Sequence, residues 1–267
     1  MTNAAYTHIQ VEQAGGILWV SLNRPRVYNA MDGQMMQELA HCFAAVGGLT
    51  GARVLVLSGV GPSFCAGADL EWMRTVANLG MEENLADAAL LADLLSGLNS
   101  CPVPTVARAH GAVFGGGIGL LAACDVVVAA DDARFSLSEV KLGLLPAVIS
   151  PFVVAKIGES HARALFSSGA RFDADRALRI GLVHQVASAT DLDTALHVTL
   201  KDYLTAAPGA AAEARSLIST VSGRPPAEVR AETIQLIARL RSGPEGREGI
   251  AAFLEKRKPA WIEGESR

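Results

Sequence analysis

The stretch from His110 to Asp125 carries glycines at a density that favours chemistry on a bound anion. Five of its sixteen residues are glycine, and they precede an apolar run typical of a helix. Residues without a Cβ let a ligand approach the backbone closely, and the first amides of a helix have no partner within it. Such a turn can bind an oxyanion, or it can be a tight turn from a strand into a closely packed helix. The glycines alone leave both interpretations open.

Two kinds of phosphate site fit this glycine turn poorly. A dinucleotide-binding fingerprint starting at Gly115 and Gly117 needs a third glycine at position 120, where the sequence has Leu120. The P-loop pattern of nucleoside triphosphatases does not occur anywhere in the chain. Neither a dinucleotide nor a triphosphate is therefore the expected ligand.

A second loop rich in small residues extends from Ser58 to Leu70, after an apolar run at 54–57. Its small side chains leave the backbone amides accessible. The G-x-S-x-G elbow of serine hydrolases fails here, because Cys65 stands where the second glycine would have to follow Ser63. We expect structural roles for Ser63 and Cys65.

The elements that must position these loops alternate between strand and helix. A hairpin is predicted from 9–11 and 17–22, with further strands at 54–57, 105–107 and 125–130. Asp32 can cap a helix with apolar residues at helical spacing over 35–46, and a second helical pattern covers 85–98. This order predicts an α/β core with crossover connections. From Pro151 the pattern is nearly all helical, apart from a brief strand at 182–186, which predicts a smaller domain or an oligomerisation layer.

Composition excludes several function classes. The 267 residues are 50% hydrophobic and 19% charged, with a net charge of −4 and scattered basic residues, which argues against a nucleic-acid partner. No apolar run is long enough to span a membrane, and the N-terminus lacks a secretory pattern. The four cysteines stand far apart, so neither a metal site nor a disulfide scaffold is expected, and a cytoplasmic location is predicted.

Taken together, the motifs give a resemblance that covers nearly the whole chain. The sequence resembles the crotonase superfamily of enoyl-CoA hydratases and isomerases. The matching segments, in chain order, are Asn23-Arg24-Pro25 to Asn29-Ala30, Phe64 to Leu70, His110 to Gly119, Phe135 to Val140 with Leu142-Gly143, Gly181-Leu182-Val183, and Phe253 to Arg257. The resemblance implies a ββα spiral core over residues 1–189 and a helical region over 190–267 that forms a homotrimer or a dimer of trimers.

The resemblance also implies an acyl-CoA substrate, of which coenzyme A is a part, and no separate cofactor. Its thioester oxygen would lie between the amides of Ala68 and Gly116, two fixed donors suited to the negative charge of an enolate. Glu139 matches the acid/base glutamate of the family, although a lone glutamate can also be a solvated surface charge. Typical hydratases have a second glutamate where this chain has Gly119. We expect the space beside Gly119 to serve a branched or acidic acyl chain.

The segments 114–119 and 138–151 look like the bacterial branch that hydrates 3-methylglutaconyl-CoA or isohexenylglutaconyl-CoA, which also has glycine at this position. Hydration of such an enoyl thioester is the activity expected; a Δ3,Δ2-enoyl-CoA isomerase and a catalytically silent acyl-CoA-binding protein are the alternatives. The residues that the resemblance implies along coenzyme A are Arg26, Val27, Tyr28, Ala66, Ala68, Asp69 and Leu70, with Phe253 and Lys256 near its adenine and phosphates.

Overall fold

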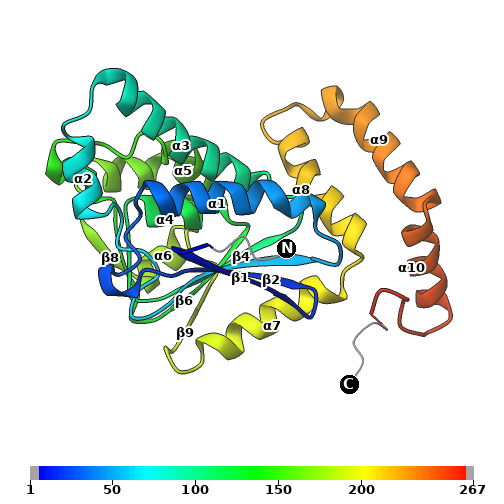
Figure 1. Cartoon of the computed structure of the whole chain (residues 1–267). Helices are drawn as coiled ribbons and strands as arrows, with labels where there is room; N and C mark the ends of the chain where they lie inside the picture. Colours follow the sequence, from blue (N-terminus) through cyan, green and yellow to red (C-terminus); the bar gives the residue numbers. More distant parts are fainter. Residues whose placement is uncertain (1–5, 263–267) are drawn as a thin grey trace.

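The computed structural model describes residues 6–262 and is built around a twisted six-stranded sheet (Figure 1). The strands lie in the order β1-β2-β3-β4-β6-β9. Their bounds are Ile9–Ala14, Ile17–Leu22, Val54–Gly59, Thr105–Ala109, Val126–Ala130 and Gln185–Ala187. The first two form the predicted antiparallel hairpin, and each later neighbour pairs in parallel. The predicted strands are confirmed, except that the last one begins at Gln185 rather than at Leu182.

A second, smaller sheet was not predicted from the sequence. It joins β5 (Ala112–Phe114), β7 (Arg134–Ser136) and β8 (Arg171–Asp173) in the order β5-β7-β8. Each strand has only three residues, too few for a period-two pattern to be recognised. This sheet places the glycine turn beside the segment that carries Glu139, because β5 leads into the turn and its neighbour β7 leads to Glu139.

Helices cover both faces of the main sheet. Their bounds are Gly33–Ala45 (α1), Leu70–Val76 (α2), Met81–Asn99 (α3), Gly116–Ala123 (α4), Ser150–Phe166 (α5), Ala174–Arg179 (α6), Leu192–Thr205 (α7), Pro208–Val221 (α8), Pro226–Ser242 (α9) and Pro244–Leu254 (α10). The large core on one face contains residues from α1, α3, α4 and α5. On the other face, Leu192, Leu196 and Leu200 of α7 pack against Val54 and Val106 of the sheet. The first helix of the 190–267 region thus completes the core.

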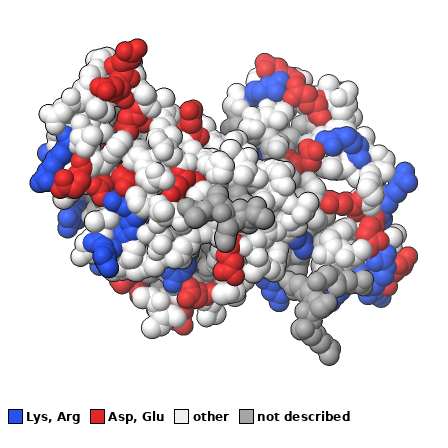
Figure 2. All heavy atoms as spheres, in the orientation of Figure 1, with Lys and Arg blue, Asp and Glu red and all other residues white. Residues whose placement is uncertain are grey.

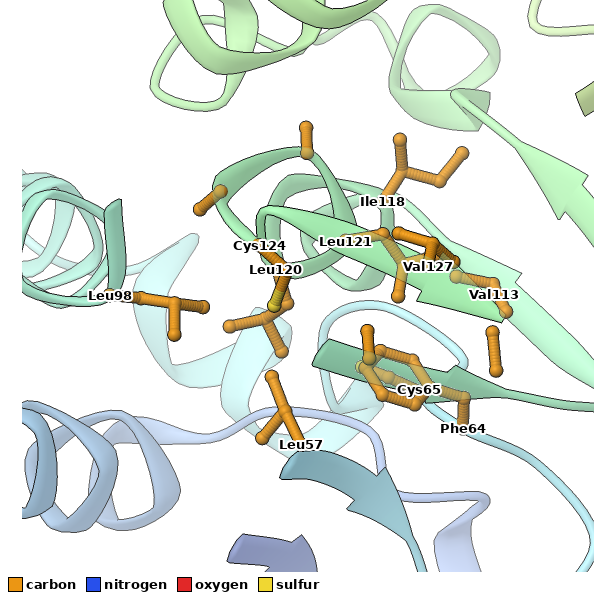
Figure 3. Close-up of a cluster of buried hydrophobic side chains, with 14 of the residues drawn as sticks. Leu57, Phe64, Cys65, Leu98, Val113, Ile118, Leu120, Leu121, Cys124 and Val127 are labelled. Carbon is orange, nitrogen blue, oxygen red and sulfur yellow. The ribbon is translucent and has the colours of Figure 1, made fainter. Parts of the chain in front are cut away.

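Helix α4 begins at the glycine turn and is held in the core by apolar contacts. All its residues after Gly116 are buried. In Figure 3, Leu120 points toward Leu57 of β3, and Ile118 and Leu121 belong to the same buried cluster. A helix packed in this way holds its N-terminus in a fixed position, which is what a preorganised anion site requires.

Helices α8, α9 and α10 extend away from the body of the molecule (Figure 1). Arg215 of α8 ties this region to the core: its guanidinium donates to both carboxylate oxygens of Asp125, at 3.0 and 2.7 Å, and to the carbonyl of Asn99 at 2.6 Å. Within residues 6–262, no helix is long and apolar enough to cross a membrane. Positive and negative side chains are interspersed on the face shown in Figure 2.

Candidate active site

The two small-residue loops identified in the sequence lie against each other. The Phe64 amide donates to the His110 carbonyl at 2.8 Å, and the Cys65 amide donates to the Ala112 carbonyl at 3.1 Å. The Phe114 amide returns a bond of 2.9 Å to the Cys65 carbonyl. These bonds pair β5 with the 58–70 loop, so Ala68 and Gly116 are brought to one place although they lie 48 positions apart in the chain.

The amides of Ala68 and Gly116 are both available to a ligand. Neither donates a hydrogen bond to another atom of residues 6–262. Gly116 is the first residue of α4, where an unpartnered amide is expected. Ala68 is exposed and is bracketed by two bonds: Met31 donates to the Gly67 carbonyl at 2.7 Å, and Asp69 donates to the Met31 carbonyl at 2.8 Å.

Glu139 faces this pair of amides across Gly115. An ideal Cβ placed on Gly115 would lie 3.2 Å from Oε1 of Glu139 and 3.9 Å from Cα of Gly67. Gly115 has φ 50° and ψ −118°, a conformation that favours glycine. A side chain at position 115 would therefore strain the turn and crowd the carboxylate. The glycine lets the carboxylate, the 64–70 loop and the start of α4 approach one another.

Burial raises the pKa of Glu139 above its ordinary value. The residue lies in a short 3-10 helix, Ser138–Leu142, and is half-buried. Its Oε2 is fully buried and has no hydrogen-bond partner in the described part of the chain. A buried carboxyl oxygen without a partner is costly, and such atoms cluster where a ligand completes the hydrogen bonding. Glu139 is therefore suited to exchange a proton with a bound molecule.

The position next to Gly119 is apolar and filled. An ideal Cβ on Gly119 would lie 2.5 Å from Cγ2 of Ile149 and 3.5 Å from Cδ1 of Leu95. Ile149 precedes α5 and is only 3% exposed. The expectation that an acyl chain would use the space directly beside Gly119 is wrong, because Ile149 occupies it.

Five of the residues assigned to coenzyme A lie together at the rim of this site. Arg26, Val27 and Tyr28 are exposed, and the Tyr28 carbonyl accepts a hydrogen bond of 3.0 Å from the Ala66 amide. Leu70, the first residue of α2, is 73% exposed. All five residues are at least partly exposed, so a ligand at the surface can reach them.

Asp69 differs from them because its carboxylate already has partners. It is 6% exposed, and its Oδ1 accepts from the amides of Glu71 and Trp72 at 2.8 and 3.1 Å, capping α2. Its Oδ2 lies 3.0 Å from Nη1 of Arg24. Burial raises the pKa of Asp69, but these hydrogen bonds and Arg24 outweigh that effect and hold it below the ordinary value. The backbone of Asp69 is bonded as well, since its amide donates to Met31 and its carbonyl accepts from Met73 at 2.8 Å, so Asp69 shapes the loop.

Phe253 and Lys256 are not brought to the site of their own chain. Phe253 is the penultimate residue of α10 and is 82% exposed. Helix α10 packs against α9, and the segment after it returns to the core at Trp261, whose carbonyl accepts from Arg53 at 3.0 Å. In Figure 1, α10 lies at the opposite side of the molecule from α2 and the start of α1. A role for either residue toward coenzyme A needs a second copy of the chain.

Three residues that position the site were not assigned a role from the sequence. Ile149 fills the place beside Gly119, Met31 joins the Ala68 loop, and Arg24 pairs with Asp69. Arg24 could have been identified from the sequence, since it lies in the family segment Asn23-Arg24-Pro25 and has Asp32 and Asp69 as candidate partners. Ile149 and Met31 give no polar signal and are found only through packing.

Comparison with known proteins agrees with this geometry. Residues 12–264 match the profile of the family described as Enoyl-CoA hydratase/isomerase. The chain belongs to this family. The enoyl-CoA hydratase AKT6-1 of Alternaria alternata is 33% identical over 257 residues, covering 93% of this chain and 82% of the relative.

Solved structures of the family show the same fold. An enoyl-CoA hydratase from Shewanella pealeana superimposes with a TM-score of 0.92 at 38% identity, covering 96% of this chain and 97% of that chain. Pseudomonas aeruginosa AtuE gives a TM-score of 0.93 at 39% identity, covering 96% and 100%. The crotonase fold with its helical C-terminal region is therefore confirmed, and an activity of the enoyl-CoA hydratase type is supported at the level of the family.

Proposed function

We propose that the protein hydrates a 2,3-enoyl thioester of coenzyme A whose β-carbon carries a branch, of the 3-methylglutaconyl-CoA kind. The observation that carries this proposal is that the amides of Ala68 and Gly116 lie near a buried carboxyl oxygen of Glu139, and that none of the three has a hydrogen-bond partner within residues 6–262. A half-buried carboxylate beside the amides also argues against a silent acyl-CoA-binding protein. The acyl preference rests on the resemblance of segments 114–119 and 138–151 to the branch with glycine in place of the second glutamate.

The proposed reaction needs one carboxylate in two roles. Water bonds to C3 while Glu139 takes its proton, and the π electrons move onto the thioester oxygen, where the two amides stabilise the negative charge. The protonated Glu139 then gives its proton to C2 as the thioester carbonyl reforms. The sum is the addition of one water molecule, and Glu139 returns to its starting state. A raised pKa suits a group that must both take and return a proton near neutrality.

A panel of thioesters tests the proposal. Crotonyl-CoA, 3-methylcrotonyl-CoA, 3-methylglutaconyl-CoA and 3-hexenoyl-CoA are incubated with the protein, and the products are identified by mass. A gain of one water on 3-methylglutaconyl-CoA, with a higher kcat/KM than on crotonyl-CoA, supports it. Absence of any mass gain on all four thioesters contradicts hydration.

An isomerase is the second candidate, and the surroundings of Gly119 favour it. With Ile149 and Leu95 at that place, no second carboxylate from α4 can hold a water molecule. Glu139 alone could remove a proton from C2 of a 3-enoyl thioester and return it to C4, with the charge held at the same two amides. Conversion of 3-hexenoyl-CoA to the conjugated 2-enoyl isomer without a mass change would identify this activity.

The filled space beside Gly119 also predicts the outcome of restoring the glutamate. We expect Gly119→Glu to lower activity on the preferred substrate and to gain less than tenfold on crotonyl-CoA. The new Cβ must displace Ile149, overpacking that costs about 1–3 kcal/mol, and the buried charge has no assigned partner. Steady-state kinetics on both thioesters and thermal unfolding measure these effects. Gly119→Glu combined with Ile149→Ala is the control that relieves the overlap; a tenfold gain on crotonyl-CoA by the single variant would show that the glycine marks a lost catalytic residue.

We propose that the C-terminal helices assemble the chain into a trimer or a dimer of trimers. Val229 of α9 is buried within the chain, whereas Ile234 and Ile237 of α9 and Phe253 and Leu254 of α10 are exposed. Apolar side chains grouped in this way are typical of a covered surface. A neighbouring copy would also bring Phe253 and Lys256 to a coenzyme A site, which their own chain does not do.

Light scattering at micromolar concentration is expected to give the mass of three or six chains. Ile234→Asp with Ile237→Asp should shift the protein toward monomers and raise KM for acyl-CoA. Val198→Asp is the matched control, because Val198 of α7 is 61% exposed and lies outside α8 to α10. A monomeric wild-type protein would contradict the proposed assembly.

A further inference from the structure

Arg24 is the point where the two helices beside the Ala68 loop are joined. Its Nη2 lies 3.1 Å from Oδ2 of Asp32, and its Nη1 lies 3.0 Å from Oδ2 of Asp69. The three side chains are only 9 to 18% exposed, so solvent screens their attraction less than at the surface. One guanidinium therefore holds two carboxylates that lie 37 residues apart in the chain.

Each of these carboxylates caps the start of a helix. Asp32 Oδ1 accepts from the Met35 amide at 2.8 Å at the start of α1, and Asp69 caps α2. Cap interactions of this type stabilise the first turn of a helix. Because Arg24 binds the second oxygen of both aspartates, it fixes the starts of α1 and α2 relative to one another.

The residues just before the two caps set the direction in which the Ala68 N–H points. Met31 precedes Asp32, and Ala68 precedes Asp69. The bonds from Met31 to the Gly67 carbonyl and from Asp69 to the Met31 carbonyl join these segments on both sides of Ala68. The direction of the Ala68 amide thus depends on the distance between the two caps, which Arg24 sets.

Arg24 is itself held in place. Its backbone amide donates to Oδ1 of Asn29 at 2.8 Å, and Asn29 is fully buried. The amide group of Asn29 donates to the carbonyls of Val60 and Ser63 at 2.9 and 2.8 Å. The backbone of Arg24 is therefore held by the Asn29 side chain, which also binds the start of the 58–70 loop.

We propose that Arg24 is a positioning residue for the oxyanion site, which orients the Ala68 amide through the capping carboxylates of Asp32 and Asp69. The proposal rests on the proposed function in one respect, that the Ala68 amide binds the thioester oxygen. Loss of Arg24 releases the two caps from each other and lets the amide turn away. Small displacements of a catalytic group reduce rates by large factors, on the order of 10² for about 1 Å.

The test combines a spectroscopic measurement with kinetics. Hydrogen bonds to the thioester oxygen polarise a conjugated acyl group, so cinnamoyl-CoA should absorb at longer wavelength when it is bound to the wild-type protein. In Arg24→Met we expect at least half of this red shift at saturation to be lost and kcat to fall by more than tenfold, with KM changed by less than threefold. Arg24→Lys, which can pair with one carboxylate at a time, should be intermediate. Methylguanidinium should restore part of the shift in Arg24→Ala.

Arg215→Met is the matched control. Arg215 is as buried as Arg24 and also pairs with an aspartate, Asp125, but within residues 6–262 its hydrogen bonds go to Asp125, Cys101 and the end of α3, and none goes to α1 or α2. Its loss should lower the melting temperature and leave the red shift of bound cinnamoyl-CoA unchanged. A loss of shift in both variants would mean that any destabilisation disturbs the site, which would overturn the specific role of Arg24.

Hydrogen exchange of the ligand-free protein separates this proposal from the proposed function. Amides of the 67–73 segment should exchange at least tenfold faster in Arg24→Met than in wild type, because local opening becomes easier. If Arg24→Met folds and shows unchanged amide exchange and an unchanged red shift, the proposed role of Arg24 is overturned. If Arg24→Met does not fold, the exchange and the red shift of Arg24→Lys decide in the same way. If wild type binds cinnamoyl-CoA without any shift, the proposed thioester site fails, whatever the exchange shows.

Discussion

Glu139→Gln is expected to lower kcat on the preferred enoyl-CoA by about 10²–10⁴, the range in which positioned acid–base groups contribute. Glutamine keeps the shape of the side chain but cannot take or return a proton. Binding of the acyl-CoA should stay close to that of wild type, because the amides of Ala68 and Gly116 remain in place. Steady-state kinetics and the Kd of a non-reactive acyl-CoA measure the two effects separately.

The pH profile provides a second measurement on the same residue. Glu139 must be ionised to act as a base, so kcat/KM should fall as the pH falls through its pKa. Since burial raises that pKa, the acidic limb should lie above the ordinary range of a glutamate. Glu159→Gln is the control, because the Glu159 side chain is 79% exposed on α5 and should affect neither rate nor profile. More than a tenth of the wild-type rate in Glu139→Gln would remove Glu139 from its role.

The parts of the site that the sequence predicts are those in which local backbone geometry requires a particular residue. Gly115 suits its position because its φ is positive, and Gly116 suits its position because the terminal methyl of Met31 packs where a Cβ would be. Such requirements leave a motif in consecutive residues. The role of Asp32 as a helix cap is likewise confirmed, because capping is a short-range property of a polar residue at the start of an element.

What the sequence could not predict depends on contacts between distant segments. The filling of the space beside Gly119 by Ile149 follows from how α5 packs on α4, which no periodicity records. The second sheet consists of strands too short to be recognised individually. Asp69 was assigned to coenzyme A from its motif, whereas its carboxylate is held by α2 and Arg24.

Gly116→Pro is expected to lower kcat by about 10²–10³, the usual effect of removing one oxyanion donor. Proline lacks the backbone N–H, so the substitution removes the proposed donor itself. The first position of a helix is where proline is tolerated best, because its missing N–H has no partner within the helix and its φ suits the first turn. The rest of α4 should therefore keep its buried packing.

Gly116→Ala is the matched control that makes this result interpretable. Any Cβ at this position meets the terminal methyl of Met31, which is the flexible end of a side chain. Alanine introduces that contact and keeps the N–H, whereas proline introduces it and loses the N–H. The ratio of kcat for Gly116→Ala to that for Gly116→Pro then isolates the amide, provided that circular dichroism shows both variants to be folded. A ratio near one would mean that the Gly116 amide does not stabilise charge in the transition state, and the oxyanion would have to be assigned to other donors, while a ratio of about 10² or more assigns it to the first amide of α4.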